Sequence, residues 1–237
     1  MNKVLILIAA GLALLLVGAS MVSAATVDIE VTNSSHNIYF TPLLITAHPV
    51  GDHLFQPGTA ATLSLQAMAE GGDISLLLAD VGGADADTIA NPAGGLLAPG
   101  QSTSTTLITA AANTRLSLVG MLLPTNDGFV GLDDLVLPIA PGTYVYYLNG
   151  YDAGTEANDE LINSVNGGVP GTPGIPADPT GLAGSGGSGV AASETNPLVH
   201  IHRGNLGDTD PAGGSSDLDS REHRWLNPVA QLRLTVH

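Results

Sequence analysis

The chain has 237 residues, with 22 acidic against six basic side chains and a formal net charge of −16 at pH 7. Because such a surface repels phosphate backbones, nucleic acid is excluded as an expected partner. The chain has no cysteine, so neither a disulfide nor a lipid on a cleavage-site cysteine is expected. Aromatic residues make up 4% of the chain, so Val, Leu and Ile are expected to fill most of its core.

Residues 1–24 have the pattern of a secretory signal peptide. Lys3 precedes an apolar run at residues 4–17, and small residues follow up to the expected cleavage point after Ala24. An uncleaved amino-terminal anchor is the alternative interpretation. No second apolar run in the sequence approaches the length of a membrane span. Residues 25–237 are therefore expected to form one domain that is secreted, periplasmic or held at the cell surface.

Short β-strands dominate the elements predicted after this leader. In the first of them, Val27, Ile29 and Val31 alternate with polar residues, which is the period of a strand with one buried face. Gly, Pro, Asn and Asp separate the β-rich runs, and this favours an antiparallel β-sandwich or barrel over a βαβ fold. Further strands are predicted at residues 38–41, 43–46, 104–109, 115–123, 143–149, 198–202 and 229–236.

Two short segments and one long segment depart from the strand pattern. Residues 63–70 carry Leu65 and Met68 at helical spacing, whereas residues 73–79 fit either a short helix or a strand. Residues 167–189 are rich in Gly, Pro and Ser and predict a long flexible loop inserted between two strands. A linker between two domains is the alternative, but the segment that follows is short for an independent core.

Two acidic segments, at residues 124–134 and 151–160, are predicted to be turns that flank the strand at 143–149. They hold seven carboxylates and no Lys or Arg. Crowded carboxylates repel one another, a bound cation relieves the repulsion, and a set of oxygen donors favours calcium over zinc. Solvated loops of an acidic protein are the alternative interpretation. The seven residues are Asp127, Asp133, Asp134, Asp152, Glu156, Asp159 and Glu160.

Asp127 and Asp152 are the first candidates for calcium ligands. Each is followed closely by a glycine, Gly128 or Gly154, that lets backbone carbonyls turn toward an ion. The two segments converge if both emerge at the same end of a sandwich. The alternative for both aspartates is a turn in which the side chain bonds its own backbone. Further candidate ligands are Glu156, Asp133 and Asp159, whereas Asp134 and Glu160 are expected at the solvated surface.

Two other groups of residues suggest weaker metal sites. His200 and His202 lie two apart on a predicted strand, so both rings face one side and could bind zinc or copper. Ordinary hydrogen bonds are the alternative, because no spacing rule supplies a third ligand. A second acidic stretch at residues 207–219 has two Asp-x-Asp pairs. Because Arg221 and Arg224 can neutralise it, a surface loop is expected there.

Catalytic motifs are not apparent in the sequence. The chain lacks a Gly-x-Ser-x-Gly motif, and many of its serines lie in the predicted flexible loop. Paired carboxylates can cleave glycosides, but Trp225 is the one tryptophan available as a sugar platform. Trp225 is expected to pack in the core instead. A non-catalytic protein is therefore expected.

Several motifs, taken in order, resemble the spondin domain and in particular its cysteine-free prokaryotic branch. The most specific are PTNDGFVGLD at residues 124–133 and DAGTE at residues 152–156. Together the matching motifs cover most of the chain after the leader. The others are HPVGDHLFQPG at 48–58, AMAEGGD at 67–73 and NPVAQLRLTV at 227–236.

This resemblance implies an antiparallel β-sandwich of C2-like topology, with a calcium ion held by acidic loops at one end. Known spondin domains are extracellular matrix or adhesion modules without enzymatic activity. The chain lacks cysteine and has a long insertion, so the partners of the animal proteins are not carried over. The resemblance therefore implies an exported calcium-binding module for an extracellular protein or glycan ligand that the sequence does not identify.

Two alternative functions remain open at this point. One is a metal-dependent hydrolase that uses His200 and His202 together with nearby acids. The other is a carbohydrate-binding module that uses calcium to bind sugar hydroxyls.

Overall fold

The computed structural model describes residues 24–81 and 86–237. The predicted signal peptide therefore lies outside the described residues, apart from Ala24 at the expected cleavage point. Within the described ranges, no helix is long and apolar enough to cross a membrane.

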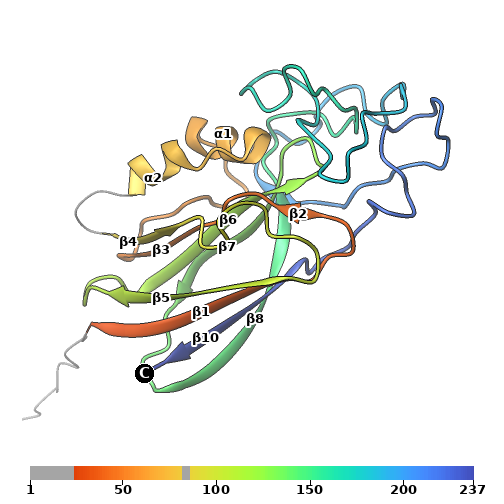
Figure 1. Cartoon of the computed structure of the whole chain (residues 1–237). Helices are drawn as coiled ribbons and strands as arrows, with labels where there is room; N and C mark the ends of the chain where they lie inside the picture. The colour runs from red at the N-terminus through yellow and green to blue at the C-terminus, as the bar shows by residue number, and fades with distance from the viewer. Residues whose placement is uncertain (1–23, 82–85) are drawn as a thin grey trace, which may run out of the picture.

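The described chain forms a mostly antiparallel β-sheet folded into two layers (Figure 1), which confirms the predicted all-β class. One layer contains β5 (Ser102–Thr109), β1 (Ala25–Asn33), β10 (Ala230–Val236) and the first part of β8 (Gly142–Asp152). The other contains β4 (Asp87–Ala90), β3 (Leu44–His48), β6 (Arg115–Leu123), β7 (Gly128–Val136) and the end of β8. Two short strands complete the sheet: β2 (Tyr39–Phe40) beside β6, and β9 (His200–Ile201) beside β8.

Strand β8 joins the two layers and leads to the end of the sandwich where the acidic segments lie. Its residues 142–148 pair with β10, and its residues 149–152 pair with β7. Leu148, at the change of partner, is buried in the core between the layers. The last residue of β8, Asp152, consequently lies beside the first residue of β7, Gly128.

The alternating pattern that predicts β1 buries one face of that strand. Val27, Ile29 and Val31 lie in the core between the layers, where Leu232 and Leu234 of β10 join them. Each such side chain contributes roughly 1.5–3 kcal/mol when it is fully removed from water. Trp225 lies in the same core, as its sequence context predicts.

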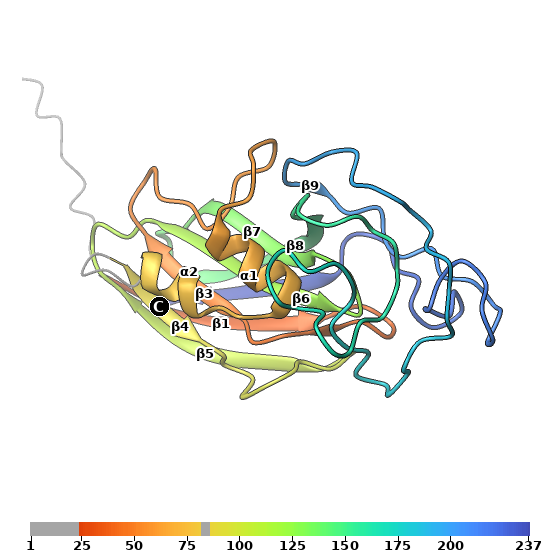
Figure 2. The same cartoon turned by 90° about the horizontal axis from the view of Figure 1, so that it is seen from above.

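Two short helices, α1 (Leu63–Gly71) and α2 (Ser75–Val81), cover the outer face of the layer that contains β3, β6 and β7 (Figure 2). Thr62 caps α1, because its hydroxyl accepts a hydrogen bond from the backbone N–H of Leu65 at 3.1 Å. The helix ends at Gly71 and is capped by Gly72, whose left-handed conformation (φ +71°) favours glycine. The ambiguous segment at residues 73–79 is thus largely helical.

The structure corrects the interpretation of the acidic segment at residues 124–134. The segment is a turn only as far as Asp127, and from Gly128 onward it is strand β7. Residues 128–131 are all buried, so the strand shows no alternation of apolar and polar residues. Asp133 and Asp134 then interrupt the apolar run, which gave the sequence the appearance of a loop. Strand β4 was also absent from the predicted elements.

The coil after β8 gathers at one end of the sandwich (Figure 1) and contains the Gly/Pro/Ser-rich insertion at residues 167–189. Buried carboxylates bind the backbone of this insertion. Glu70 of α1 accepts a hydrogen bond from the N–H of Gly171 at 2.7 Å. Asp217 accepts hydrogen bonds from the N–H groups of Ser185, Gly186 and Gly187 at 2.8–3.0 Å.

The chain returns to the sheet after this coil. Strand β10 lies between β1 and β8, so the segments before and after the insertion share one core.

Candidate functional site

The candidate site is at the end of the sandwich where β8 stops and β7 begins. Asp127 is the last residue of the β6–β7 turn, and Asp152 is the last residue of β8. The backbone N–H of Ala153 donates to the carbonyl of Asp127 at 3.2 Å, which holds the two segments together. Both side chains are buried, with 0% and 2% of Asp127 and Asp152 exposed. The two acidic segments therefore meet at one end of the fold.

Both carboxylates bind the loop that follows β8. The Oδ2 atom of Asp127 accepts hydrogen bonds from the N–H of Thr155 at 2.8 Å and of Glu156 at 3.1 Å. The Oδ1 atom of Asp152 accepts from the N–H of Gly154 at 2.8 Å, so this residue also makes the turn interaction that was the alternative for it. These bonds leave the Oδ1 atom of Asp127 buried without a hydrogen-bond partner.

A third acid, Glu156, adds a second unpartnered oxygen to this end of the sheet. Its Oε2 atom accepts hydrogen bonds from the N–H of Gly174 at 3.0 Å and from Asn126 at 3.3 Å. Its Oε1 atom is buried and has no hydrogen-bond partner. Most buried polar atoms in native proteins are hydrogen-bonded, so unpartnered carboxylate oxygens are candidates for ligation by a cation.

The charges of these acids are unfavourable in the absence of a cation. Burial raises the pKa of Asp127 to about 7, and repulsion from the charge of Asp152 also raises it. Hydrogen bonds from Thr155 and Glu156 lower this pKa and offset part of the rise. Burial raises the pKa of Glu156 to about 8, and the charge of nearby Glu70 contributes. Burial also raises the pKa of Asp152. The three groups therefore hold protons more strongly than exposed carboxylates do.

These raised pKa values predict how the stability of the calcium-free protein depends on pH. The folded state releases the protons of Asp127 and Glu156 at a higher pH than the unfolded state, so their contribution to stability falls as pH rises toward about 8. Burial lowers the pKa of His202 to about 3. This shift makes stability rise with pH, but only below about pH 6.5, where the histidine of the unfolded chain is protonated.

We therefore expect the free energy of unfolding, measured in chelator, to decrease by on the order of 1–2 kcal/mol between pH 6.5 and 8.5. Denaturant titrations at fixed ionic strength measure this slope. The Glu156→Gln variant should have a smaller slope, and a slope equal to that of the unmodified chain would contradict the assignment.

The other predicted ligands occupy different surroundings. Asp133 lies on β7, roughly 17 Å along the strand from Gly128 at 3.4 Å per residue, and contacts His53 at 3.0 Å. The Oδ1 atom of Asp159 accepts hydrogen bonds from Asn126 at 2.8 Å and from the N–H of Leu161 at 3.0 Å. The structure thus brings Asp127, Asp152 and Glu156 together, places Asp159 next to them through Asn126, and leaves Asp133 apart.

Glu160 is buried, contrary to its expected place at the solvated surface. Its carboxylate accepts hydrogen bonds from the N–H groups of Leu206 and Gly207 and from the hydroxyl of Ser216. These donors come from a segment about fifty residues later in the chain, which explains why local sequence did not indicate burial. Asp134, by contrast, is partly exposed and lies 3.5 Å from Arg115.

The donor set at this end of the sheet suits a hard cation. Over the ranges that the structure describes, no three or more His, Asp or Glu side chains form a group that could hold a metal by themselves. Calcium, however, takes six to eight oxygen ligands that include backbone carbonyls, amides and water. Carboxylates with unpartnered oxygens fit that requirement better than the requirements of zinc.

Residues 32–164 match the spondin N-terminal family, described as Spondin_N. The chain belongs to this family. The matched range is more than half of the chain and includes Asp127, Asp152 and Glu156. Spondin N-terminal domains are typical of extracellular proteins, and membership of the family suggests a module of the binding or adhesion type. No curated protein matches the chain.

His202, one of the two histidines in the predicted pair, helps to position the Asp152 carboxylate of this spondin domain. The Nδ1 atom of His202 accepts a hydrogen bond from the N–H of Gly204 at 2.8 Å, so its Nε2 atom carries the proton and donates to Asn158 at 3.0 Å. Asn158 in turn donates to the Oδ2 atom of Asp152 at 2.6 Å. Both ring nitrogens of His202 are therefore engaged, and the ring holds the Asp152 carboxylate through Asn158.

His200 and His202 differ in their surroundings although they share one face of the strand. The Nδ1 atom of His200 lies 2.8 Å from the carbonyl of Leu198, and its Nε2 atom lies 3.7 Å from Asp152. His202 packs against Trp225, with 4.9 Å between ring centroids. The sequence spacing identified this pair but gave no indication that Asn158 connects it to the acidic site.

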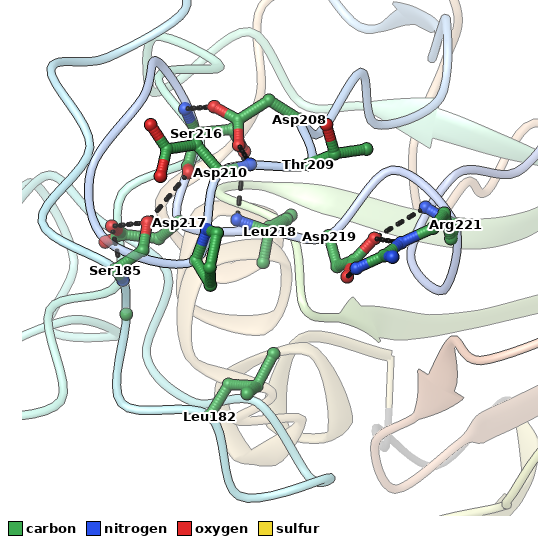
Figure 3. A pocket seen from close by; sticks show the side chains of 12 residues that line it. Leu182, Ser185, Asp208, Thr209, Asp210, Ser216, Asp217, Leu218, Asp219 and Arg221 are labelled. Atoms are coloured by element: carbon green, nitrogen blue, oxygen red, sulfur yellow. Dashed lines mark hydrogen bonds and ion pairs between the residues drawn. The ribbon is translucent and has the colours of Figure 1, made fainter.

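The second acidic stretch of the spondin domain lines a separate cavity of about 140 Å³ (Figure 3). Its carboxylates are satisfied within the protein. Asp208 accepts hydrogen bonds from the N–H groups of Ser215 and Ser216, and Asp219 forms an ion pair with Arg221. The pairing with Arg221 is the neutralisation that the sequence suggested for this stretch.

Proposed function

We propose that this spondin domain is an exported, non-catalytic binding module and that one calcium ion organises its loop end. The observation that carries the proposal is the pair of buried, unpartnered oxygens on Asp127 and Glu156, next to an Asp152 whose charge repels that of Asp127. The three carboxylates have raised pKa values, and their described ion pairs include no Lys or Arg. A divalent cation would relieve both the repulsion and the missing contacts.

Asp127 and Asp152 would hold the ion, together with backbone oxygens and water, because no group of three such side chains is already in place among the described residues. When bound, calcium supplies positive charge and fixes the relative positions of its ligands. The chain itself orients the carboxylates: Thr155 binds Asp127, and Asn158 binds Asp152. The β6–β7 turn and the loop after β8 are thereby joined into one rigid surface at the end of the sandwich, which is the part of a sandwich that commonly carries binding.

Thermal melting with calcium and with chelator tests the proposal. At a calcium concentration of about 100 times the dissociation constant, the folded state gains about 2.7 kcal/mol. For a domain of this size that gain corresponds to a rise in melting temperature of roughly 5–11 °C. Magnesium at the same concentration serves as the control and is expected to give a smaller rise, because it binds reluctantly without its own water shell. Identical melting temperatures with calcium and chelator would refute the ion site.

Export is the second part of the proposal and rests on the pattern of the leader. Amino-terminal sequencing of protein recovered from the periplasm or the medium is expected to begin at Ala25. Protein that retains Met1 at the membrane would instead support an anchor.

A metal-dependent hydrolase has less support from the same site. It requires a free nitrogen on His202, and both nitrogens of that ring are engaged. Ser117 and His48 form another pair with the spacing of a nucleophile and its base, with 2.8 Å between the hydroxyl and Nε2. Because Ser117 is 0% exposed and His48 only 2%, a substrate cannot reach the hydroxyl without rearrangement. A binding role is therefore preferred.

A further inference from the structure

A polar cavity of about 310 Å³ adjoins the proposed ion site. Asp152 belongs to both, since it lines the cavity and is also one of the three clustered acids. Asn158, which holds Asp152, lies on the cavity wall as well. A ligand in this cavity would therefore contact the group of residues that the ion organises.

The remaining walls of the cavity combine a cation with neutral hydrogen-bonding groups. Arg203 supplies nitrogen donors, and Ser193 and Thr195 supply hydroxyls. Glu194 also lines the cavity, but one of its oxygens already accepts the N–H groups of the two residues that follow it. Ile201, which is half exposed, is the one large apolar side chain on the wall, and the one ring is the imidazole of His200, so the cavity has no Phe, Tyr or Trp anchor of the kind that dominates peptide interfaces.

We propose that this cavity binds a uronic-acid unit of an acidic polysaccharide. The sugar carboxylate would pair with the guanidinium of Arg203, whose planar donors match a carboxylate in two hydrogen bonds. The sugar hydroxyls would bind Asn158, Ser193 and Thr195. A neutral sugar would leave Arg203 without a partner, and an acidic peptide would find only Ile201 as an apolar contact, a side chain that the apolar face of a sugar ring can equally cover.

The negative charge of the whole domain does not oppose such a ligand at this position. Charges are screened beyond about 8 Å at physiological ionic strength, so the groups inside the cavity determine the local potential. Arg203 contributes donors there. The inference rests on the proposed function in one respect, because a calcium ion at Asp152 would add further positive charge. Glu194 and Asp152 then act as acceptors for sugar hydroxyls.

Calorimetric titration of the full domain with a galacturonate trimer tests the inference, with thermal melts recorded in parallel. The trimer is expected to bind in calcium, whereas its methyl ester, which lacks the charge, is expected to bind at least about tenfold more weakly. The Arg203→Gln variant should lose about ten- to hundredfold in affinity, as expected for a hydrogen bond between charged groups. Its calcium-dependent melting shift should be unchanged. Arg233→Gln, an equivalent charge removal at an exposed position on β10, is the matched control and should bind as the unmodified chain does.

Each other outcome has a distinct meaning. A calcium-dependent melting shift without binding of the trimer overturns the inference and leaves the proposed function standing. Equal binding of the methyl ester, or tighter binding of a glutamate peptide, also overturns it. Binding of the trimer that depends on Arg203, in a protein without a calcium-dependent melting shift, supports the cavity assignment and overturns the ion site.

Discussion

Replacing both Asp127 and Asp152 by asparagine is expected to abolish the calcium-induced rise in melting temperature. The double variant lacks two anionic ligands, so the roughly 2.7 kcal/mol that calcium adds at a hundredfold excess should disappear. In chelator at pH 8, the variant should melt at or above the temperature of the unmodified protein. The reason is that the pKa of both carboxylates is raised by burial, and amides carry no charge to bury or to repel.

This combination separates a cation site from an ordinary structural role. If the two carboxylates served only to bind the loop backbone, their loss would lower stability with or without calcium. Asp52→Asn together with Asp210→Asn removes the same charge from two exposed positions and should leave the calcium response intact. Differential scanning calorimetry of the three proteins measures both quantities, and a full calcium response in the Asp127/Asp152 variant would exclude these residues as ligands.

Replacing Phe129 by alanine is expected to lower the free energy of unfolding by about 3–5 kcal/mol. Phe129 is 0% exposed and packs edge-on against Phe55, with 5.0 Å between ring centroids, and against Tyr151 at 5.7 Å. Phe55 and Tyr151 also contact each other at 4.9 Å, so the three rings form one cluster. Loss of the central ring leaves a cavity that two rings from different segments cannot fill.

Phe129→Leu is the matched control for this prediction. It keeps an apolar side chain in the position and should cost clearly less than alanine, because the cavity is smaller. Denaturant unfolding at constant pH and calcium concentration measures both variants. A cost below about 1 kcal/mol for Phe129→Ala would show that the aromatic cluster does not hold the 49–62 segment to β7 and β8 as the structure indicates.

The sequence predicted β1, which has one buried face, and also β3 and β6, which are buried on both faces, but it missed β4 and β7. Val27, Ile29 and Val31 alternate with polar residues because solvent covers the other face of β1. The first four residues of β7 are buried on both sides, below α1 and above the core, and so lack this alternation. β6 is buried to a similar extent and was predicted, so the difference lies in Asp133 and Asp134, which interrupt the apolar run of β7 and made it resemble a loop.

For the candidate site, the sequence indicated the acids but not their support. Asp127 and Asp152 could be found because acidic residues without a basic partner stand next to glycines in two nearby segments. Asn158 and His202 could not, since their hydrogen bonds to Asp152 depend on how distant loops meet. Glu70 lies on α1, more than eighty residues before Glu156, and only the folded chain shows that the charge of one affects the other.

The carboxylates that hold the insertion also affect how its sequence can change during evolution. Glu70, Glu156 and Asp217 bind main-chain N–H groups at Gly171, at Gly174 and along residues 185–187. Every amino acid except proline offers such a group, so the attachment is insensitive to most side chains between these points. Outside the glycines that need left-handed backbone, the insertion can therefore accumulate substitutions, and present new chemistry to a partner, while its path across the domain is preserved.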